Sequence, residues 1–277
     1  MIGNHGLNPI GDDMKHLACI ALFGIAILAP LATIPAAGEK PTPWRPFIPV
    51  DSYANLTKRS IQTIETKAAS GDKNAEARIE VEAILLAGYS LNTAAKNGLA
   101  DYRAAARYAA DMARSGKSKE LVMFSQRVGK IKAVGDTSDV TKYTKGTDLM
   151  MKLMFSKAKG GEGIHPDLQY LPKLKNLNGI EALLGALANK KLSDENLAKV
   201  SKELPPLAYR VAVIGALTHE FTPKKDVEKW RDYSLTMRDA SVALAEASAK
   251  KDAEGILKSA LAIESSCIDC HSVFKNK

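Results

Sequence analysis

The chain has 277 residues, enough for one large domain or two small ones with a buried core. Aromatic residues make up only 6% and alternating runs of Val, Ile and Thr are rare, so the composition favours an all-α fold. The formal net charge is +8, but the lysines are scattered without interleaved aromatic residues. This pattern indicates a solvated basic surface and argues against a nucleic-acid groove.

Residues 1–37 are expected to form a leader. Lys15 follows Met14 and precedes a long apolar run that ends in small residues near Ala37. A charged start, an apolar middle and a small-residue exit are typical of a signal peptide, so we expect translation to begin at Met14 and the protein to be periplasmic. The run is nearly long enough to span a bilayer, so an uncleaved membrane anchor is the alternative.

Residues 38–50 contain four prolines and are expected to form an extended linker, or a strap over the domain behind it. Residues 51–140 then read as an N-terminal helical domain. Short Gly-, Asn- or Asp-bearing turns separate its helical segments, which favours an antiparallel bundle. The expected helices are 51–70, 74–95, 98–116 and 117–133.

The second half, residues 141–277, is also expected to be helical. A helix drawn through residues 140–158 stops at a glycine-rich stretch, and a short helix follows at 177–190. Three long helices come last, and a capping residue or a proline marks the expected start of each. The first begins at Ser193 and is expected to kink or break at Pro205 and Pro206, the second begins at Thr222 and Pro223, and the third begins at Asp252.

Cys267, Cys270 and His271 form the pattern Cys-x-x-Cys-His near the end of the last expected helix. This pattern is the attachment signature of a c-type haem, in which both thiols bond to the haem vinyl groups and the histidine becomes the proximal iron ligand. The cysteines lie three apart on a helical turn, and the histidine is rotated about a quarter turn further. We therefore expect one covalent haem c, attached after export.

Three other uses of the thiols are weaker. A structural zinc site needs about four ligands, and outside the leader only His165 and His219 remain to complete it. A thioredoxin-like dithiol needs a βαβ context that this helical pattern does not offer. A disulfide between cysteines three apart on one helix is strained.

Residues of about 143–277 resemble the cytochrome c′ and cytochrome c556 group, whose four-helix bundles carry Cys-x-x-Cys-His on the final helix. The shared features are the stretch CIDCHSVFK, the long preceding helix with its very short turn, and an upstream helix rich in methionine. Lys275 stands where the family more usually has arginine. The resemblance implies a haem-bearing four-helix bundle at 141–277 and does not extend to residues 51–140.

The resemblance also bears on the sixth iron ligand. In the c556-like branch a methionine on the first bundle helix binds the iron, and in the stretch DLMMKLMFS the closest match is Met151, with Met150 and Met154 as alternatives. Methionine ligation implies a six-coordinate electron carrier. Without it, the resemblance implies a five-coordinate, c′-like protein that binds nitric oxide or carbon monoxide. Ordinary core packing also accounts for methionines here.

We expect an exported monohaem cytochrome that transfers electrons and is not an enzyme, because no acid/base pair, nucleophile triad or phosphate loop can be placed. A peroxidase-like activity is the weakest alternative. Redox proteins with acidic surfaces are the expected partners, a homodimer is expected only from the family resemblance, and membrane contact is expected only through an uncleaved leader. Segments 101–107 and 232–238 share Asp, Tyr and Arg at the same positions, so the haem-free domain 51–140 is either a degenerate duplicate or unrelated.

Overall fold

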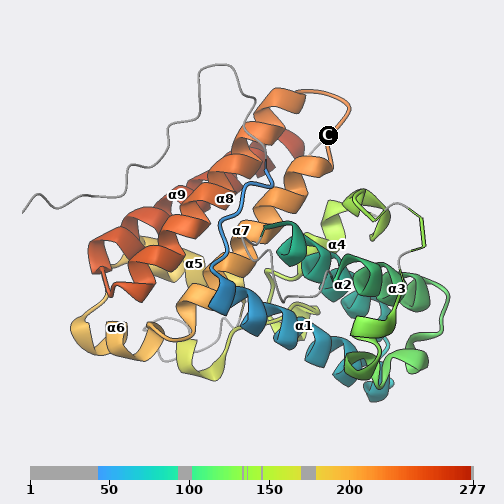
Figure 1. Ribbon diagram of the computed structural model, residues 1–277. Coiled ribbons are helices and arrows are strands. Elements are labelled where there is room, and N and C mark those ends of the chain that lie inside the picture. Colours follow the sequence, from blue (N-terminus) through green and yellow to red (C-terminus); the bar gives the residue numbers. More distant parts are fainter. Residues whose placement is uncertain are drawn as a thin grey trace, which may run out of the picture. The chain divides into compact units, whose positions relative to one another are not determined.

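The computed structural model describes residues 43–92 and 102–275, apart from residues 133, 136, 145 and 170–178 (Figure 1). The expected leader, residues 1–37, and the first part of the proline-rich segment lie outside the described residues. Within the described part of the chain, no helix combines the length and the apolar character needed to cross a membrane.

The described residues contain helices and no β-strand, which confirms the all-α prediction. Short 3-10 turns, η1 to η6, connect some of the α-helices. The α-helices are α1 (Val50–Ser70), α2 (Ala75–Asn92), α3 (Arg103–Arg114), α4 (Thr147–Lys152), α5 (Ile180–Asn189), α6 (Asp194–Val200), α7 (Leu204–Glu220), α8 (Val227–Ala249) and α9 (Ala253–Phe274).

Helix α2 is the central helix of the first half and packs against both α1 and α3 (Figure 1). Every residue from 79 to 89 in α2 is buried. A helix that is buried all round has to be enclosed by other elements. Helix α3 can lie close to α2 because all of its buried residues are alanines.

The second half forms a row of neighbouring helices, in which α7 packs on α8, α8 on α9, and α9 on α5 (Figure 1). Gly215 lets α7 and α8 approach closely, since a Cβ there would lie 2.8 Å from the backbone nitrogen of Arg238. A salt bridge of 3.1 Å between Lys191 and Glu254 places the end of α5 beside the start of α9. Neighbours along this row therefore have the close helix–helix contacts of a bundle.

Helix α2 also packs against α7 and so joins the two halves. The approach is close, because a Cβ added at Gly88 of α2 would lie 2.5 Å from Cγ1 of Val213 in α7. Residues 42–277 belong to one compact unit, in which contacts cross residue 140. The boundary between 51–140 and 141–277 stays a sequence prediction.

A buried carboxylate, that of Glu82, lies where α2 meets α7. Its Oε1 accepts a hydrogen bond from Arg210 of α7 and lies 3.1 Å from Nη2 of Arg78, while its Oε2 accepts from the Ser60 hydroxyl of α1 at 2.8 Å. Nε of Arg210 lies 2.7 Å from Oε2 of Glu162. Burial alone would lower the pKa of Arg210, but the carboxylates of Glu162 and Glu82 outweigh it and raise that pKa. The network thus connects α1, α2, α7 and the loop before α5.

The prediction of an α-helix at 117–133 is wrong, because this segment forms the 3-10 turns η1 (Ser118–Leu121), η2 (Phe124–Gln126) and η3 (Val128–Lys130). Glu65 of α1 supplies a reason. Its Oε1 accepts both the backbone N–H of Ser125, at 2.8 Å, and the hydroxyl of the same residue, at 2.6 Å. That N–H is therefore diverted from an α-helical bond within the segment.

The helix expected at 140–158 is reduced to α4, and both of its ends have a cause. Gly146, just before α4, has φ 147°, a value that favours glycine and interrupts a right-handed helix. After α4, the carbonyl oxygen of Met154 accepts a hydrogen bond of 2.9 Å from the backbone N–H of Glu181 at the start of α5. In a helix running to residue 158 this carbonyl would accept the N–H of residue 158, so its use at the start of α5 replaces one bond of the expected helix.

Four expected helix boundaries in the second half can be compared directly. The break near Pro205 and Pro206 is confirmed, because α6 ends before them and they occupy the first turn of α7, where their missing N–H is harmless. Ser193 caps α6 and Asp252 caps α9, as expected. The start of α8 at residue 222 is wrong, because Asp226 adopts a left-handed conformation with φ 56° and the helix begins after it.

Residues 43–48 lie as a strap over parts of α7, α8 and the end of α2. The indole of Trp44 donates to Oε1 of Glu220 in α7 at 2.7 Å, and Arg45 donates to Asp239 of α8 at 3.1 Å. Two consecutive backbone N–H groups, at residues 47 and 48, donate to the carbonyl oxygen of Asn92. The strap therefore connects the end of α2 with the α7–α8 pair.

Replacing Glu82 with Gln is expected to lower the free energy of unfolding by about 3 kcal/mol, because the buried guanidinium of Arg210 then loses one of its two carboxylate partners and keeps only Glu162. Urea unfolding followed by circular dichroism measures this change. The double variant E82L/R210M is expected to lose less than the sum of its single variants, because it removes both members of this pair and leaves Arg78 and Glu162, 3.6 Å apart, to pair with each other.

The control for this prediction is Glu195→Gln, which removes an exposed i,i+4 pair with Lys199 in α6. Its expected effect is below about 0.5 kcal/mol. If Glu82→Gln destabilised the protein no more than this control, the buried network would not hold the two halves together.

Candidate functional site

The Cys-x-x-Cys-His residues lie on the last two turns of α9. Asp252 begins this helix by accepting the backbone N–H groups of the second and third residues after it. Ile256, Ala260 and Ile263 then face the core and are buried. The buried face of α9 thus fixes the direction in which the motif at its end can point.

The three motif residues differ in exposure. Cys267 is half-buried and packs against the hydrophobic core, Cys270 is also half-buried, and His271 is exposed. Both thiols are free. The cysteine pair is therefore partly turned to the interior, and the imidazole lies on the adjoining, accessible side of the helix.

Burial raises the pKa of the Cys267 and Cys270 thiols to about 11. For Cys267, the neighbouring Cys270 and the carboxylates of Glu181 and Glu264 add to this effect, while Ser266 opposes it. Both side chains are therefore neutral thiols at neutral pH. A reactive dithiol or a thiolate metal site needs the opposite shift, so the surroundings disfavour these two uses.

The methionine segment meets the site region at the first turn of α5. Glu181, whose charge acts on Cys267, donates its backbone N–H to the Met154 carbonyl oxygen at 2.9 Å. Met150 and Met154 are buried, and Met151 is half-buried and packs against the core. The structure thus brings the backbone of Met154 to the helix that packs on α9, whereas Met150 and Met151 lie in α4.

A tryptophan of α8 fixes the end of α9. The ring of Trp230 packs edge-on against Phe274, with centroids 5.1 Å apart and planes at 90°, and its indole N–H donates to the carbonyl oxygen of Thr218 in α7 at 2.8 Å. The sequence pattern by itself does not show this contact. The signal that could find it is the short turn at Asp252, because Trp230 and Phe274 are equally distant from it along an antiparallel pair.

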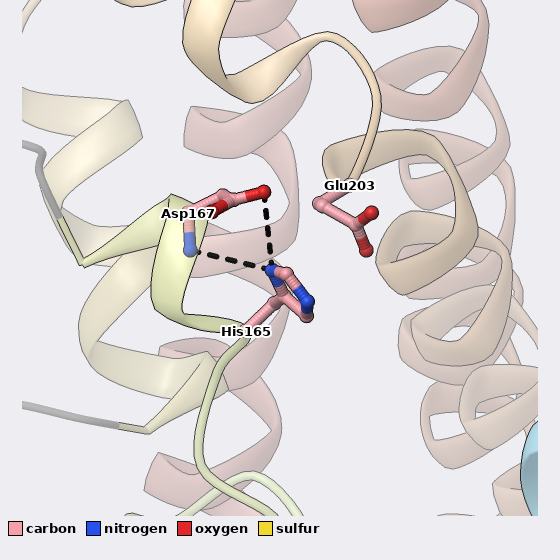
Figure 2. Close-up of side chains that lie close together, drawn as sticks. All are labelled: His165, Asp167 and Glu203. Atoms are coloured by element: carbon pink, nitrogen blue, oxygen red, sulfur yellow. Dashed lines mark hydrogen bonds and ion pairs between the residues drawn. The ribbon is translucent and has the colours of Figure 1, made fainter.

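A different cluster of titratable side chains, His165, Asp167 and Glu203, lies at the start of α7 (Figure 2). Nδ1 of His165 accepts the Asp167 backbone N–H at 3.3 Å and lies 3.6 Å from its carboxylate. Arg59 donates to the buried Glu203 at 2.8 Å; burial would raise the pKa of Glu203, but Arg59 outweighs it and lowers that pKa. The cluster is therefore a polar contact between a loop and the start of α7, in which Arg59 pairs with Glu203, and we assign no metal to it.

His165 is too far from the thiols to complete a zinc site. It lies beside Glu203 at the start of α7, whereas the motif is connected to the opposite end of α7 through Thr218 and Trp230. The 17 residues of α7 span about 25 Å. His219 lies in the last turn of α7, where burial lowers its pKa below the usual value of a histidine.

The raised thiol pKa values predict slow alkylation of the haem-free protein. With iodoacetamide, the rate at pH 7–8 is expected to be far below that of the urea-unfolded chain, and to keep rising by about tenfold per pH unit until the pH approaches about 11. Mass spectrometry of timed samples measures both rates. A folded protein whose alkylation rate levels off near pH 8 would show that the thiols are not in these buried surroundings.

No protein-family model, no curated protein and no solved structure matches this chain. The function is therefore argued from the residues and contacts of the site itself.

Proposed function

We propose that this protein is an exported monohaem c-type cytochrome that carries one electron at a time. The observation that carries the proposal is the Cys-x-x-Cys-His sequence on the last turns of a packed helix, with both thiols free and the imidazole exposed. These donors fit a covalently attached haem, because two thiols and one adjacent histidine are the groups that such a haem requires.

Each residue has one role in this proposal. Cys267 and Cys270 hold the haem through thioether bonds, and His271 binds the iron from the proximal side. When bound, the haem supplies the one-electron couple between ferrous and ferric iron. The buried face of α9 keeps the three groups in a fixed relation, since Cys267 packs on the core while His271 faces outward.

The sixth ligand in the proposal is Met151, with Met150 and Met154 as the alternatives. Methionine ligation raises the reduction potential and leaves no open position for a gas. One observation favours the competing function, a five-coordinate protein that binds nitric oxide or carbon monoxide. Met150 and Met154 are buried and Met151 is half-buried, as ordinary core methionines are.

The remaining features of the proposal concern location and partners. Residues 141–277 form the C-terminal haem domain of the four-helix type in this proposal, and residues 51–140 bind no haem. The expected leader delivers the protein to the periplasm. Its partners are redox proteins, favoured with acidic surfaces by the net charge of +8, and it acts without nucleic acid and without catalysing a reaction of its own.

Optical spectra of the matured protein separate the two functions. The oxidised and reduced protein is expected to be low-spin, with a sharp reduced α-band that carbon monoxide does not change. Met151→Leu is expected to convert it to a high-spin form that binds carbon monoxide, because the sixth position is then open.

Met150→Leu and Met154→Leu are the matched controls and are expected to keep the low-spin spectrum. A wild-type spectrum that is already high-spin and shifts with carbon monoxide would remove the methionine ligand and favour the gas-binding function. The variant C267S/C270S is expected to lose covalent haem, and a wild-type chain without covalent haem would contradict both functions.

A further inference from the structure

The last turn of α9 is held from the side by two connected contacts. Phe274 packs edge-on against Trp230, and the indole N–H of Trp230 donates to the Thr218 carbonyl oxygen at 2.8 Å. Edge-on packing of two aromatic rings stabilises the contact beyond the contribution of the apolar area that the rings bury. The end of α9 is thereby attached to both α8 and α7.

The indole is fixed in its own position by α7. Thr218 lies in the last turn of α7, and its carbonyl oxygen accepts two donors, the backbone N–H of Phe221 at 3.1 Å and the indole N–H of Trp230 at 2.8 Å. Gly215 brings the backbones of α7 and α8 close together one turn earlier. Trp230 therefore has little freedom to rotate or to move away from Phe274.

Phe274 is three residues after His271, and residues at this spacing are neighbours on a helix surface. The helix ends at Phe274, and Lys275 closes it by donating its backbone N–H to the carbonyl oxygen of His271 at 3.1 Å. Terminal helix turns are the part of a helix that opens most readily. The contact with Trp230 thus restrains the turn that carries the imidazole.

We propose that Trp230 is a positioning residue for His271: through Phe274 it holds the last turn of α9, so that the imidazole keeps one orientation towards the iron. This inference rests on the proposed haem attachment. Groups that orient a metal-binding histidine tune the metal site although they do not touch the metal. Trp230 is expected to influence the reduction potential and the strength of the histidine–iron bond in the same way.

The test uses the matured, haem-bearing full chain with Trp230→Phe and Trp230→Ala. Trp230→Ala is expected to shift the midpoint potential and to speed the replacement of His271 by added imidazole, because the last turn opens more often. Trp230→Phe keeps a ring against Phe274 and loses only the hydrogen bond. Its midpoint potential and its rate of imidazole exchange are therefore expected to stay close to those of the wild type.

Trp44→Phe is the matched control, because the Trp44 indole N–H also donates to the end of α7, at Glu220, but belongs to the strap and not to the α8–α9 contact. It is expected to leave the midpoint potential and the imidazole exchange unchanged. Circular dichroism and the haem spectrum of the denatured protein show separately that each variant is folded and carries covalent haem.

Two outcomes would overturn the inference. Trp230→Ala could be folded, carry covalent haem and have wild-type potential and exchange, which would make Trp230 an ordinary packing residue. Trp44→Phe could shift the potential as much as Trp230→Ala, which would trace the effect to the stability of α7. A wild-type chain without covalent haem is a different result, because it contradicts the proposed function itself.

Discussion

The fold depends on a fully buried carboxylate that lies between two guanidinium groups. Glu82 of α2 is fully buried and lies between Arg78 of its own helix and Arg210 of α7. Removing these charges from water is costly, and the cost is offset only while all of the partners stay in place. The pair between Glu82 and Arg210 spans 128 positions of sequence, so it fixes α7 against α2 in a way that local preferences cannot.

Helix α7 connects this buried ion pair to the part of the molecule that carries the Cys-x-x-Cys-His residues. The close approach at Gly215 places α8 on α7, and the short turn capped by Asp252 returns the chain along α8 as α9. Trp230 then connects α7 with Phe274 at the end of α9. The Cys-x-x-Cys-His residues therefore lie on a helix end that is held through a series of contacts leading back to the buried ion pair.

The sequence predicts the local features well because local physics decides them. Helix-forming segments bounded by turn residues predict the ends of α1, α2, α5 and α9 to within a few residues. The side-chain chemistry of Ser193 and Asp252 identifies both as helix caps. In each of the two failed helices, a partner distant in sequence takes a backbone group. Glu65 of α1 takes the N–H of Ser125, and the start of α5 takes the carbonyl of Met154, and neither partner is adjacent in sequence.

The candidate site shows the same difference between local features, which the sequence predicts, and tertiary features, which it does not. The spacing of Cys267, Cys270 and His271 alone identifies the candidate site, because both the chemistry and the helix geometry lie within five residues. The support by Trp230 requires knowing that α8 and α9 are antiparallel, and the burial of the thiols requires knowing what packs on α9. These are tertiary facts, for which the sequence offers only the position of the turn at Asp252.

The most direct test of the central claim is the intact mass of the protein after export in a host that attaches haem to apocytochromes. The account predicts a mature chain heavier by the mass of one haem, with the addition retained after denaturation and confined to the peptide that contains Cys267 and Cys270. A chain recovered with two unmodified thiols, from a host that matures a known c-type cytochrome in parallel, would contradict it.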